Sequence, residues 1–241
     1  MTEYTEINDS SRPAAAVVLG HYAGLLGEGW WRLPDAVRRR FTEGPAPGAT
    51  RLYTGTVIAT ELSPFGQIVA HLARFAGGPM PFTNGAVGPT TVAVTSVADL
   101  HGSGNAAQVW TRSYARDGAF PQVIQSAKCF SGPTGLEERL GYCLSMRLKV
   151  TAEGRPGAAE LVFASTAYLL SLGPLSLTLP AWLSPGRCEV RHRDEGCVDR
   201  IEIGAVEARA VRAFTFTLTI THPLFGRVLR QIARYHEVQS A

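Results

Sequence analysis

Apolar and polar residues alternate along much of the chain between residues 50 and 221. The alternation is clearest in residues 142–150 and in residues 213–221, where phenylalanine, leucine and isoleucine are separated by threonines. Successive side chains of a β-strand point to opposite faces, so this pattern predicts antiparallel strands with one buried face. In the first segment the residues predicted to share the buried face are Tyr142, Leu144, Met146, Leu148 and Val150.

The pattern predicts an α+β fold. Gly, Pro, Asp and Asn separate the β-rich segments, and tight hairpin turns are expected at Asp117-Gly118 and at Gly196. We count about eight or nine strands in a strongly curved antiparallel sheet or β-barrel with flanking helices. Closure or helix cover is expected because either one removes exposed strand edges.

Helical signals flank and interrupt this sheet. Residues 63–76 are predicted to form a helix, with Ser63 as its N-cap, Pro64 at its first position and apolar residues at helical spacing. Residues 222–237 are predicted to form a C-terminal helix whose apolar stripe is Leu224, Val228, Ile232 and Tyr235. Residues 1–49 are expected to be helical and loop-like, with the arginines of "RRRF" at a helix end facing water. The chain is expected to be a single domain over residues 1–241, with the sheet over 50–221.

Charge and hydropathy exclude several classes of partner. The net charge of +3 is scattered along the 241 residues, so we expect no nucleic-acid partner. The first residues are polar and acidic, unlike a signal peptide, and a cytoplasmic location is expected. The apolar stretch 168–183 is too short and too interrupted by glycine and proline to span a membrane as a helix.

Cofactor motifs have no support in the sequence. Gly102, Gly104 and Ala107 match a GxGxxA pattern, but a strand follows where a dinucleotide site needs a helix, so a hairpin loop is expected there. The histidines and the four cysteines lack metal-ligand spacing. We therefore expect no cofactor, no metal and no disulfide.

Arg112 lies between two large aromatic residues on one predicted strand face. Trp110 and Tyr114 favour the interior for that face, and a buried arginine needs a carboxylate or the oxygen atoms of a ligand. Glu137 and Glu138 are candidate carboxylates. A ligand anchor and a purely structural Arg–Glu pair remain open alternatives.

Lys128 and His222 are two further candidates. Lys128 shares a face with Ile124, Ser126 and Phe130; if that face is interior, burial lowers the pKa of the lysine and suits it to proton transfer or charge pairing. The alternative places the opposite face inside and Lys128 in water. His222, just before Pro223, is expected to orient the turn into the last helix and is a candidate acid or base.

Four segments resemble a known family. They are "WTRSY", "GLEERLGYCLSMRL", "LPAWLSP" and "FTFTLTITHPLFGRVLR". The pattern is similar to that of domain of unknown function 4166, a bacterial domain that occurs alone or fused behind saccharopine-dehydrogenase-like proteins. The resemblance runs from "GEGWWRLPDAVRRRF" to the end of the predicted last helix. It implies an intact domain in a bacterial cytosolic setting and assigns no catalytic residues.

These features favour a barrel that binds a small, largely apolar organic molecule and that, if it is an enzyme, needs no cofactor. Cyclisation, isomerisation or dehydration of an intermediate of secondary metabolism requires only positioning and a proton shuttle. The candidate catalytic residues are Arg112, Lys128, Glu138 and Tyr114. The candidate ligand-binding residues are Trp110, Ser126, Tyr142, Met146, Phe216 and His222.

Two alternative functions do not require catalysis. The first is a lipid or polyketide carrier that touches membranes through residues 168–183 and the basic last helix. The second is a structural partner domain of a reductase, as the fusions of the family suggest. Residues 168–183 are expected to form either a lid or an exposed apolar patch.

Overall fold

The computed structural model describes most of the chain beyond residue 21. The described residues are 22–42, 48–75, 80–81, 83–97, 107–131, 135–172, 175–200 and 209–238. Gly102 and Gly104 of the GxGxxA pattern lie outside these residues, as do the first 21 residues of the predicted N-terminal segment.

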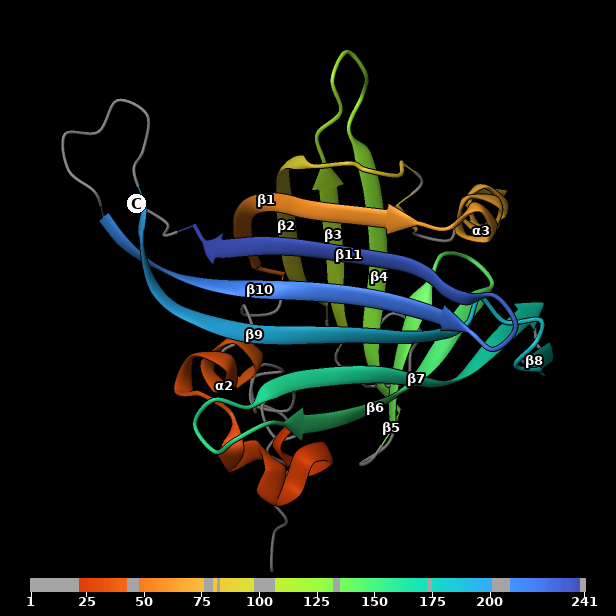
Figure 1. Cartoon of the computed structure of the whole chain (residues 1–241). Coiled ribbons are helices and arrows are strands. Elements are labelled where there is room, and N and C mark those ends of the chain that lie inside the picture. The colour runs from red at the N-terminus through yellow and green to blue at the C-terminus, as the bar shows by residue number, and fades with distance from the viewer. Residues whose placement is uncertain are drawn as a thin grey trace, which may run out of the picture.

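Ten antiparallel strands form a closed barrel, and one further strand pairs on its outside (Figure 1). The strand order is β6-β5-β4-β3-β2-β1-β11-β10-β9-β7, and pairing between β6 and β7 closes the ring. β8 extends the sheet beyond β7. The strands are β1 (Thr50–Leu62), β2 (Gly88–Val97), β3 (Ala107–Tyr114), β4 (Gln122–Ser131), β5 (Gly135–Leu140), β6 (Leu144–Glu153), β7 (Glu160–Leu172), β8 (Leu175–Leu179), β9 (Arg187–Arg200), β10 (Arg209–His222) and β11 (Gly226–Glu237).

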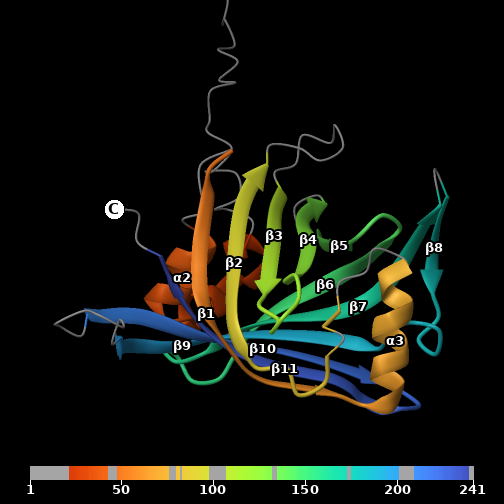
Figure 2. The same cartoon turned by 90° about the horizontal axis from the view of Figure 1, so that it is seen from above.

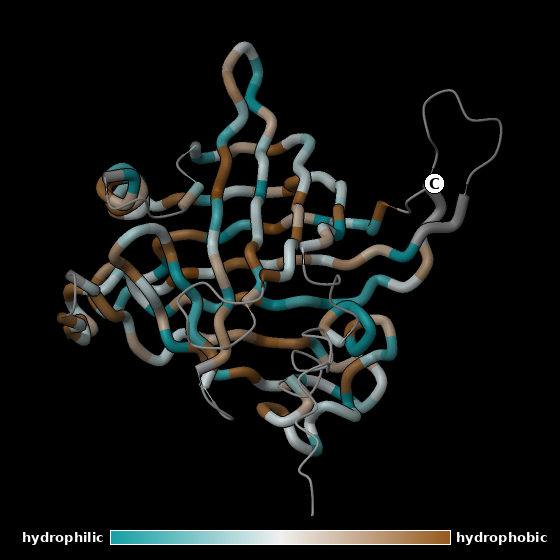
Figure 3. The backbone as a smooth tube through the Cα atoms, turned by 180° about the vertical axis from the view of Figure 1, so that it is seen from behind, coloured by the Kyte–Doolittle hydropathy of each residue, from teal (hydrophilic) through white to brown (hydrophobic). Residues whose placement is uncertain are grey.

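The alternation in the sequence becomes the inside and the outside of the barrel. Hydrophobic and hydrophilic residues alternate along the strands (Figure 3). In β6 the side chains of Met146, Leu148 and Val150 are buried, whereas Arg147 and Lys149 are exposed. The predicted antiparallel barrel is confirmed. The predicted eight or nine strands are too few, because β5, β8 and β11 were not recognised as strands.

Helices lie at opposite ends of the barrel (Figures 1 and 2). The 3-10 helix η1 (Gly27–Arg32) and α2 (Asp35–Thr42) are at one end, and α3 (Pro64–Phe75) is at the other, where the sequence predicted a helix over 63–76. Gly66 lets α3 approach β11 closely: a Cβ atom there would lie 2.1 Å from the carbonyl oxygen of Val228. No helix in the described part of the chain is long and apolar enough to cross a membrane.

The predicted C-terminal helix is wrong: these residues form strand β11. β11 pairs with β10 on one side and β1 on the other. Its inward residues include Leu229, Ala233 and Tyr235, but also the polar Gln231. Gln231 interrupts the apolar alternation, while Val228 is apolar because α3 packs against it. β11 thus has a polar residue at an inward position and an apolar residue at an outward position, and this departure from alternation gives the apolar residues a spacing that resembles a helix.

The predicted hairpin turn at Gly196 is also wrong. Gly196 lies inside β9, where the register with β10 shifts between Ala213 and Phe214. Its φ of 71° is in the left-handed region, which glycine adopts without strain. The glycine therefore marks a β-bulge in a continuous strand rather than a turn.

Strand β7 changes partner along its length. Residues 161–164 pair with β9, and residues 168–172 pair with β8. Between these two regions the backbone N–H of Cys188 in β9 donates to Oγ of Ser165 at 2.8 Å. The described residues of the segment 168–183 thus form the end of β7, β8 and the following turn. Leu175 and Leu177 of β8 are exposed, whereas Leu179 is half-buried.

Residues 22–42 fill one end of the barrel. Tyr22 packs edge-on against Phe130 at 4.9 Å between ring centroids, and Phe41 of α2 packs edge-on against His192 at 5.1 Å. Phe163 contacts both Tyr22 and Phe41. We call these five residues the aromatic plug. They form a dense core in the half of the barrel nearest α2.

Candidate functional site

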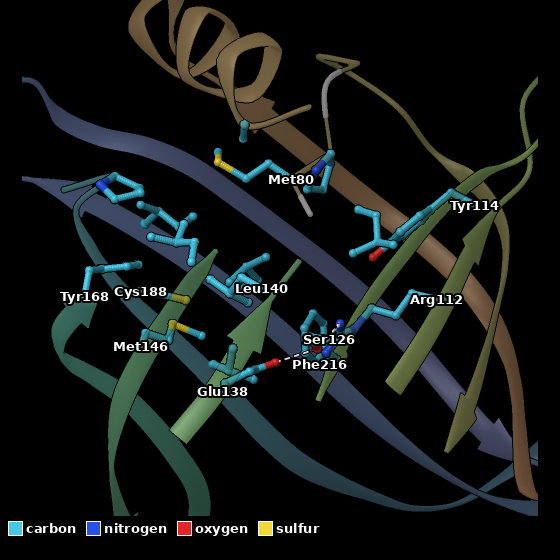
Figure 4. Close-up of a pocket in the computed structure, with 18 residues that line it drawn as sticks. Met80, Arg112, Tyr114, Ser126, Glu138, Leu140, Met146, Tyr168, Cys188 and Phe216 are labelled. Atoms are coloured by element: carbon cyan, nitrogen blue, oxygen red, sulfur yellow. Dashed lines mark hydrogen bonds between the residues drawn. The ribbon is translucent and has the colours of Figure 1, made fainter. Parts of the chain in front are cut away.

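The half of the barrel nearest α3 contains a cavity of about 80 Å³ (Figure 4). We call it the barrel cavity. Its walls are residues of β3 to β7, β9 and β10, together with Ala73 of α3, Met80, Pro81 and Pro185. Most of the lining is apolar, and the inward positions predicted from the alternation of β6 and β10 supply Met146 and Phe216.

A polar network reaches the wall of this cavity from three neighbouring strands. Nη1 of Arg112 (β3) donates to Oγ of Ser126 (β4) at 3.3 Å, and Ser126 donates to Oε1 of Glu138 (β5) at 2.7 Å (Figure 4). On the side of Glu138 away from the cavity, Nζ of Lys128 lies 3.1 Å from Oε1 of Glu138 and forms an ion pair with it. The register places Lys128 directly opposite Glu138. Antiparallel pairing of β3, β4 and β5 therefore assembles the network from residues at alternate positions.

The side chain of Lys128 lies inside the barrel. The sequence alone had left open whether it lies inside or in water. Its residue exposure is 2%, and its ammonium lies 4.9 Å from the Trp110 ring and 5.5 Å from the Phe163 ring. Such contacts with aromatic faces stabilise a buried cation. The alternative that put Lys128 in water is wrong, because the opposite face of β4, with Val123 exposed, is the outer one.

The network holds a charged carboxylate. Burial alone would raise the pKa of the Glu138 carboxyl, but the two cations and the Ser126 hydroxyl hold it below its ordinary value. Burial lowers the pKa of Lys128, and Glu138 opposes that shift. With Arg112 included, the network carries two cationic groups and one carboxylate, so it favours an electron-rich oxygen atom on its cavity side.

The other titratable groups of the cavity are held in their neutral forms. Burial raises the pKa values of Tyr114 and Tyr168, and it raises the pKa of the Cys188 thiol to about 12. The Tyr114 hydroxyl donates to Oε1 of Gln231 at 3.1 Å. A thiol and phenols of this kind are poor nucleophiles and bases at neutral pH.

Six of the ten candidate residues line the barrel cavity. They are Arg112, Tyr114, Ser126, Glu138, Met146 and Phe216. Lys128 and Trp110 lie one layer behind, between the cavity and the aromatic plug. The candidate partner Glu137 lies beside Arg139, 3.7 Å away, and not beside Arg112.

Two candidates are elsewhere. Tyr142 is 97% exposed, because it lies in the turn before β6 and not in the strand itself. His222 accepts a hydrogen bond at Nδ1 from the backbone N–H of Leu224, and its Nε2 lies 3.3 Å from the carbonyl oxygen of Trp182. It joins two turns and does not line the cavity, so its predicted role in ligand binding is not supported, and the helix it was expected to precede is a strand.

Three buried residues, Tyr168, Cys188 and His192, were not among the predicted site residues. Cys188, Val190 and His192 are alternate positions of β9, so the same pattern that identified β6 could have found them. Burial lowers the pKa of His192 well below its ordinary value, and nearby cations act in the same direction. His192 is therefore a neutral member of the aromatic plug.

Among the described residues, no group of three or more His, Cys, Asp or Glu side chains could hold a metal ion. The comparisons with known proteins identify one family: residues 33–234 match the model named "Domain of unknown function (DUF4166)". No curated protein and no solved structure matches the chain.

Proposed function

The chain belongs to the family of domain of unknown function 4166, and we propose that it binds a small, largely apolar organic molecule in the barrel cavity. The supporting observation is an apolar cavity with one polar network, Arg112–Ser126–Glu138, on its wall. Small-molecule sites commonly combine apolar walls with a few polar groups that orient the ligand.

Arg112 is the proposed anchor for the polar end of the ligand. A guanidinium has five N–H donors, and one hydrogen bond from Arg112 to another described residue, Ser126, accounts for one of them. Its neighbour Glu138 is already paired with Lys128. The donors that remain suit a carbonyl, hydroxyl or carboxylate oxygen.

The volume limits the size of the ligand. Sites for drug-sized molecules measure about 300–1,000 Å³, so a cavity of about 80 Å³ suits a compact ring or one end of a longer chain. The apolar walls would stabilise such a group by roughly 25 cal/mol for each Å² of apolar surface that leaves water.

Binding is favoured over catalysis. A general acid or base works best when its pKa is near the operating pH, whereas Tyr114, Cys188 and Glu138 all have pKa values moved away from neutrality. Burial moves the pKa of Lys128 toward neutrality, but this residue does not line the cavity. A cofactor-free cyclisation, isomerisation or dehydration would require the ligand to displace Glu138 from Lys128.

Native mass spectrometry of the protein purified from its own host tests the proposal. We expect a co-purified molecule, at most a few hundred daltons, that is lost or strongly reduced in Arg112→Met. The control is Arg147→Met, the same change on the outer face of β6. Retention of the molecule by Arg112→Met, or its absence from the unaltered protein, contradicts the proposal.

A second candidate function is a carrier that exchanges its ligand at a membrane. Large apolar side chains are exposed on α3, on β8 and in the turns at the same end of the barrel as the cavity (Figures 1 and 2). They are Ile68, Leu72, Leu175, Leu177, Trp182, Leu183, Leu224 and Phe225. Exposed apolar clusters of this kind are typical of interaction surfaces.

Liposome flotation distinguishes the carrier from a freely soluble binder. We expect flotation of the unaltered chain with vesicles of mixed zwitterionic and anionic lipids, and loss of flotation in Trp182→Ser/Leu183→Ser. Trp31→Ser, an exposed tryptophan at the α2 end, is the matched control. A chain that remains at the bottom of the gradient contradicts the carrier and leaves ligand binding to be judged by mass spectrometry.

A further inference from the structure

A second cleft lies at the opposite end of the barrel from the barrel cavity. It measures about 200 Å³ and is formed by α2 and by the ends of β1, β10 and β11. We call it the arginine cleft because four arginines line it. They are Arg39, Arg40, Arg51 and Arg212.

The strand pattern directs two of these arginines inward. Tyr53 and Phe214 are buried interior residues of β1 and β10. Arg51 and Arg212 each precede one of them by two positions, so they share the interior face at the rim of the barrel. Glu237 lies opposite Tyr53 in the register and completes this rim.

The two inward arginines have acidic partners. Nε of Arg51 lies 3.0 Å from Oε1 of Glu237, and Arg212 binds the Asp194 carboxylate with two N–H groups at 3.0 and 3.3 Å. Arg38 of α2 pairs with Asp35 on the outer side. Arg39 and Arg40 have no such partner among the described residues, so the cleft has two cations in excess.

Arg40 is the unusual member of the set. It was expected to face water at a helix end, but its guanidinium carbon lies 3.6 Å from the centroid of the Phe214 ring. Its Nη1 atom is fully enclosed and has no hydrogen-bond partner among the described residues. Burial lowers the pKa of this arginine to about 10, although it stays protonated at neutral pH. A buried donor of a charged group without a partner is costly, so such a group commonly marks a place where a partner binds.

We propose that the arginine cleft binds a dianionic phosphate group of a small molecule. Two unpaired guanidiniums match its charge, and their planar forks match its oxygen atoms with paired N–H donors. Tyr53 also lines the cleft. This site is separate from the barrel cavity and does not depend on the function proposed for that cavity.

Isothermal titration of the full chain with inorganic phosphate tests the proposal, at constant ionic strength with chloride as the competing anion. We expect saturable binding of one phosphate per chain, weakened at least tenfold in Arg40→Gln and about threefold in Arg39→Gln. Arg40→Lys, which keeps the charge but loses the fork, should fall between the unaltered chain and Arg40→Gln. The near-ultraviolet circular dichroism of each variant shows whether it has folded.

The matched control is Arg193→Gln, which removes an exposed arginine from the outer face of β9. It should bind phosphate as tightly as the unaltered chain, and so should Arg112→Met in the barrel cavity. Equal weakening in Arg193→Gln and Arg40→Gln would mean that phosphate responds only to net charge. That result, or the absence of saturable binding, overturns the proposal.

Discussion

Beneath α2 the barrel interior is filled by side chains from residues 22–42, whereas beside α3 the same barrel contains a cavity. Both halves are walled by inward-facing residues of the same strands. The difference comes from Tyr22 and Phe41, which enter from outside the sheet and pack against Phe130, Phe163 and His192. Inward apolar residues alone therefore do not decide between a core and a cavity. A segment from elsewhere in the chain has to occupy the space.

The buried ion pair lies at the boundary between the two halves. The Lys128 ammonium contacts Trp110 and Phe163 on the filled side, and Glu138 lines the barrel cavity on the other. The filled half therefore supplies the cation that fixes the carboxylate of the hollow half. Substitutions on either side of this boundary should have unequal effects.

The largest expected effect is a loss of packing in the filled half. Phe41→Ala should lower the free energy of unfolding by about 3–5 kcal/mol, because it leaves a void among four aromatic neighbours. Met146→Ala, in the cavity wall, should cost only about 2 kcal/mol, since this side chain already lacks contacts on its cavity side. Urea denaturation measures both. Equal losses would remove the distinction between the two halves.

The next effect concerns the boundary. Lys128→Met should lower the free energy of unfolding by about 3 kcal/mol, because Glu138 would remain buried with a weaker set of partners. The double variant Lys128→Met/Glu138→Gln should recover most of this loss. Arg227→Met, which breaks an exposed pair with Glu61, should cost less than about 1 kcal/mol. If the double variant is no more stable than Lys128→Met, the loss of stability in Lys128→Met does not come from leaving Glu138 buried without its cation.

A smaller effect is expected from pH. Burial depresses the pKa of His192, so below pH 6.5 the unfolded chain binds a proton that the folded chain does not, and stability falls as the pH falls. The contribution of His192 should approach 1.4 kcal/mol per pH unit between its unfolded and folded pKa values. Denaturation midpoints from pH 7.5 to 5 measure it. His192→Phe should flatten the dependence.

The smallest effect is expected at Tyr142. Tyr142→Ser should change stability by less than about 0.5 kcal/mol and leave ligand retention unchanged, because this side chain lies in a solvent-exposed turn. The same stability and mass-spectrometric measurements apply. A clear loss of ligand in this variant would extend the site beyond the barrel cavity.

The sequence predicted the barrel because most strands alternate cleanly. β3, β4 and β10 follow the pattern closely, and the predicted interior positions Trp110, Ser126 and Phe216 are all buried. β11 was misread because Gln231, which is hydrogen-bonded to Tyr114 and Thr60, is polar yet faces inward. A periodicity rule treats such a residue as exposed, and only the partners across the barrel explain its burial.

The sequence could predict those residues of the candidate site whose inward position follows from the alternation within a single strand. The aromatic neighbours of Arg112 and the alternation around Ser126 placed both residues inside the barrel. The pairing of Lys128 with Glu138 could not be predicted, since it depends on the register between β4 and β5. The arginine cleft was missed for a related reason: the helical pattern of α2 gives no sign that Phe214 lies beneath Arg40.

The change of partner along β7 leaves a seam in the wall of the barrel cavity. Where β7 leaves β9 and turns to β8, the link between them in the described part of the chain is the hydrogen bond from Cys188 to Ser165. Cys188 and Tyr168, on the two sides of this seam, both line the cavity. Parting the seam breaks one side-chain hydrogen bond rather than a ladder of backbone bonds. If the cavity binds the proposed ligand, we expect the ligand to enter at this seam while the other strand pairs stay intact.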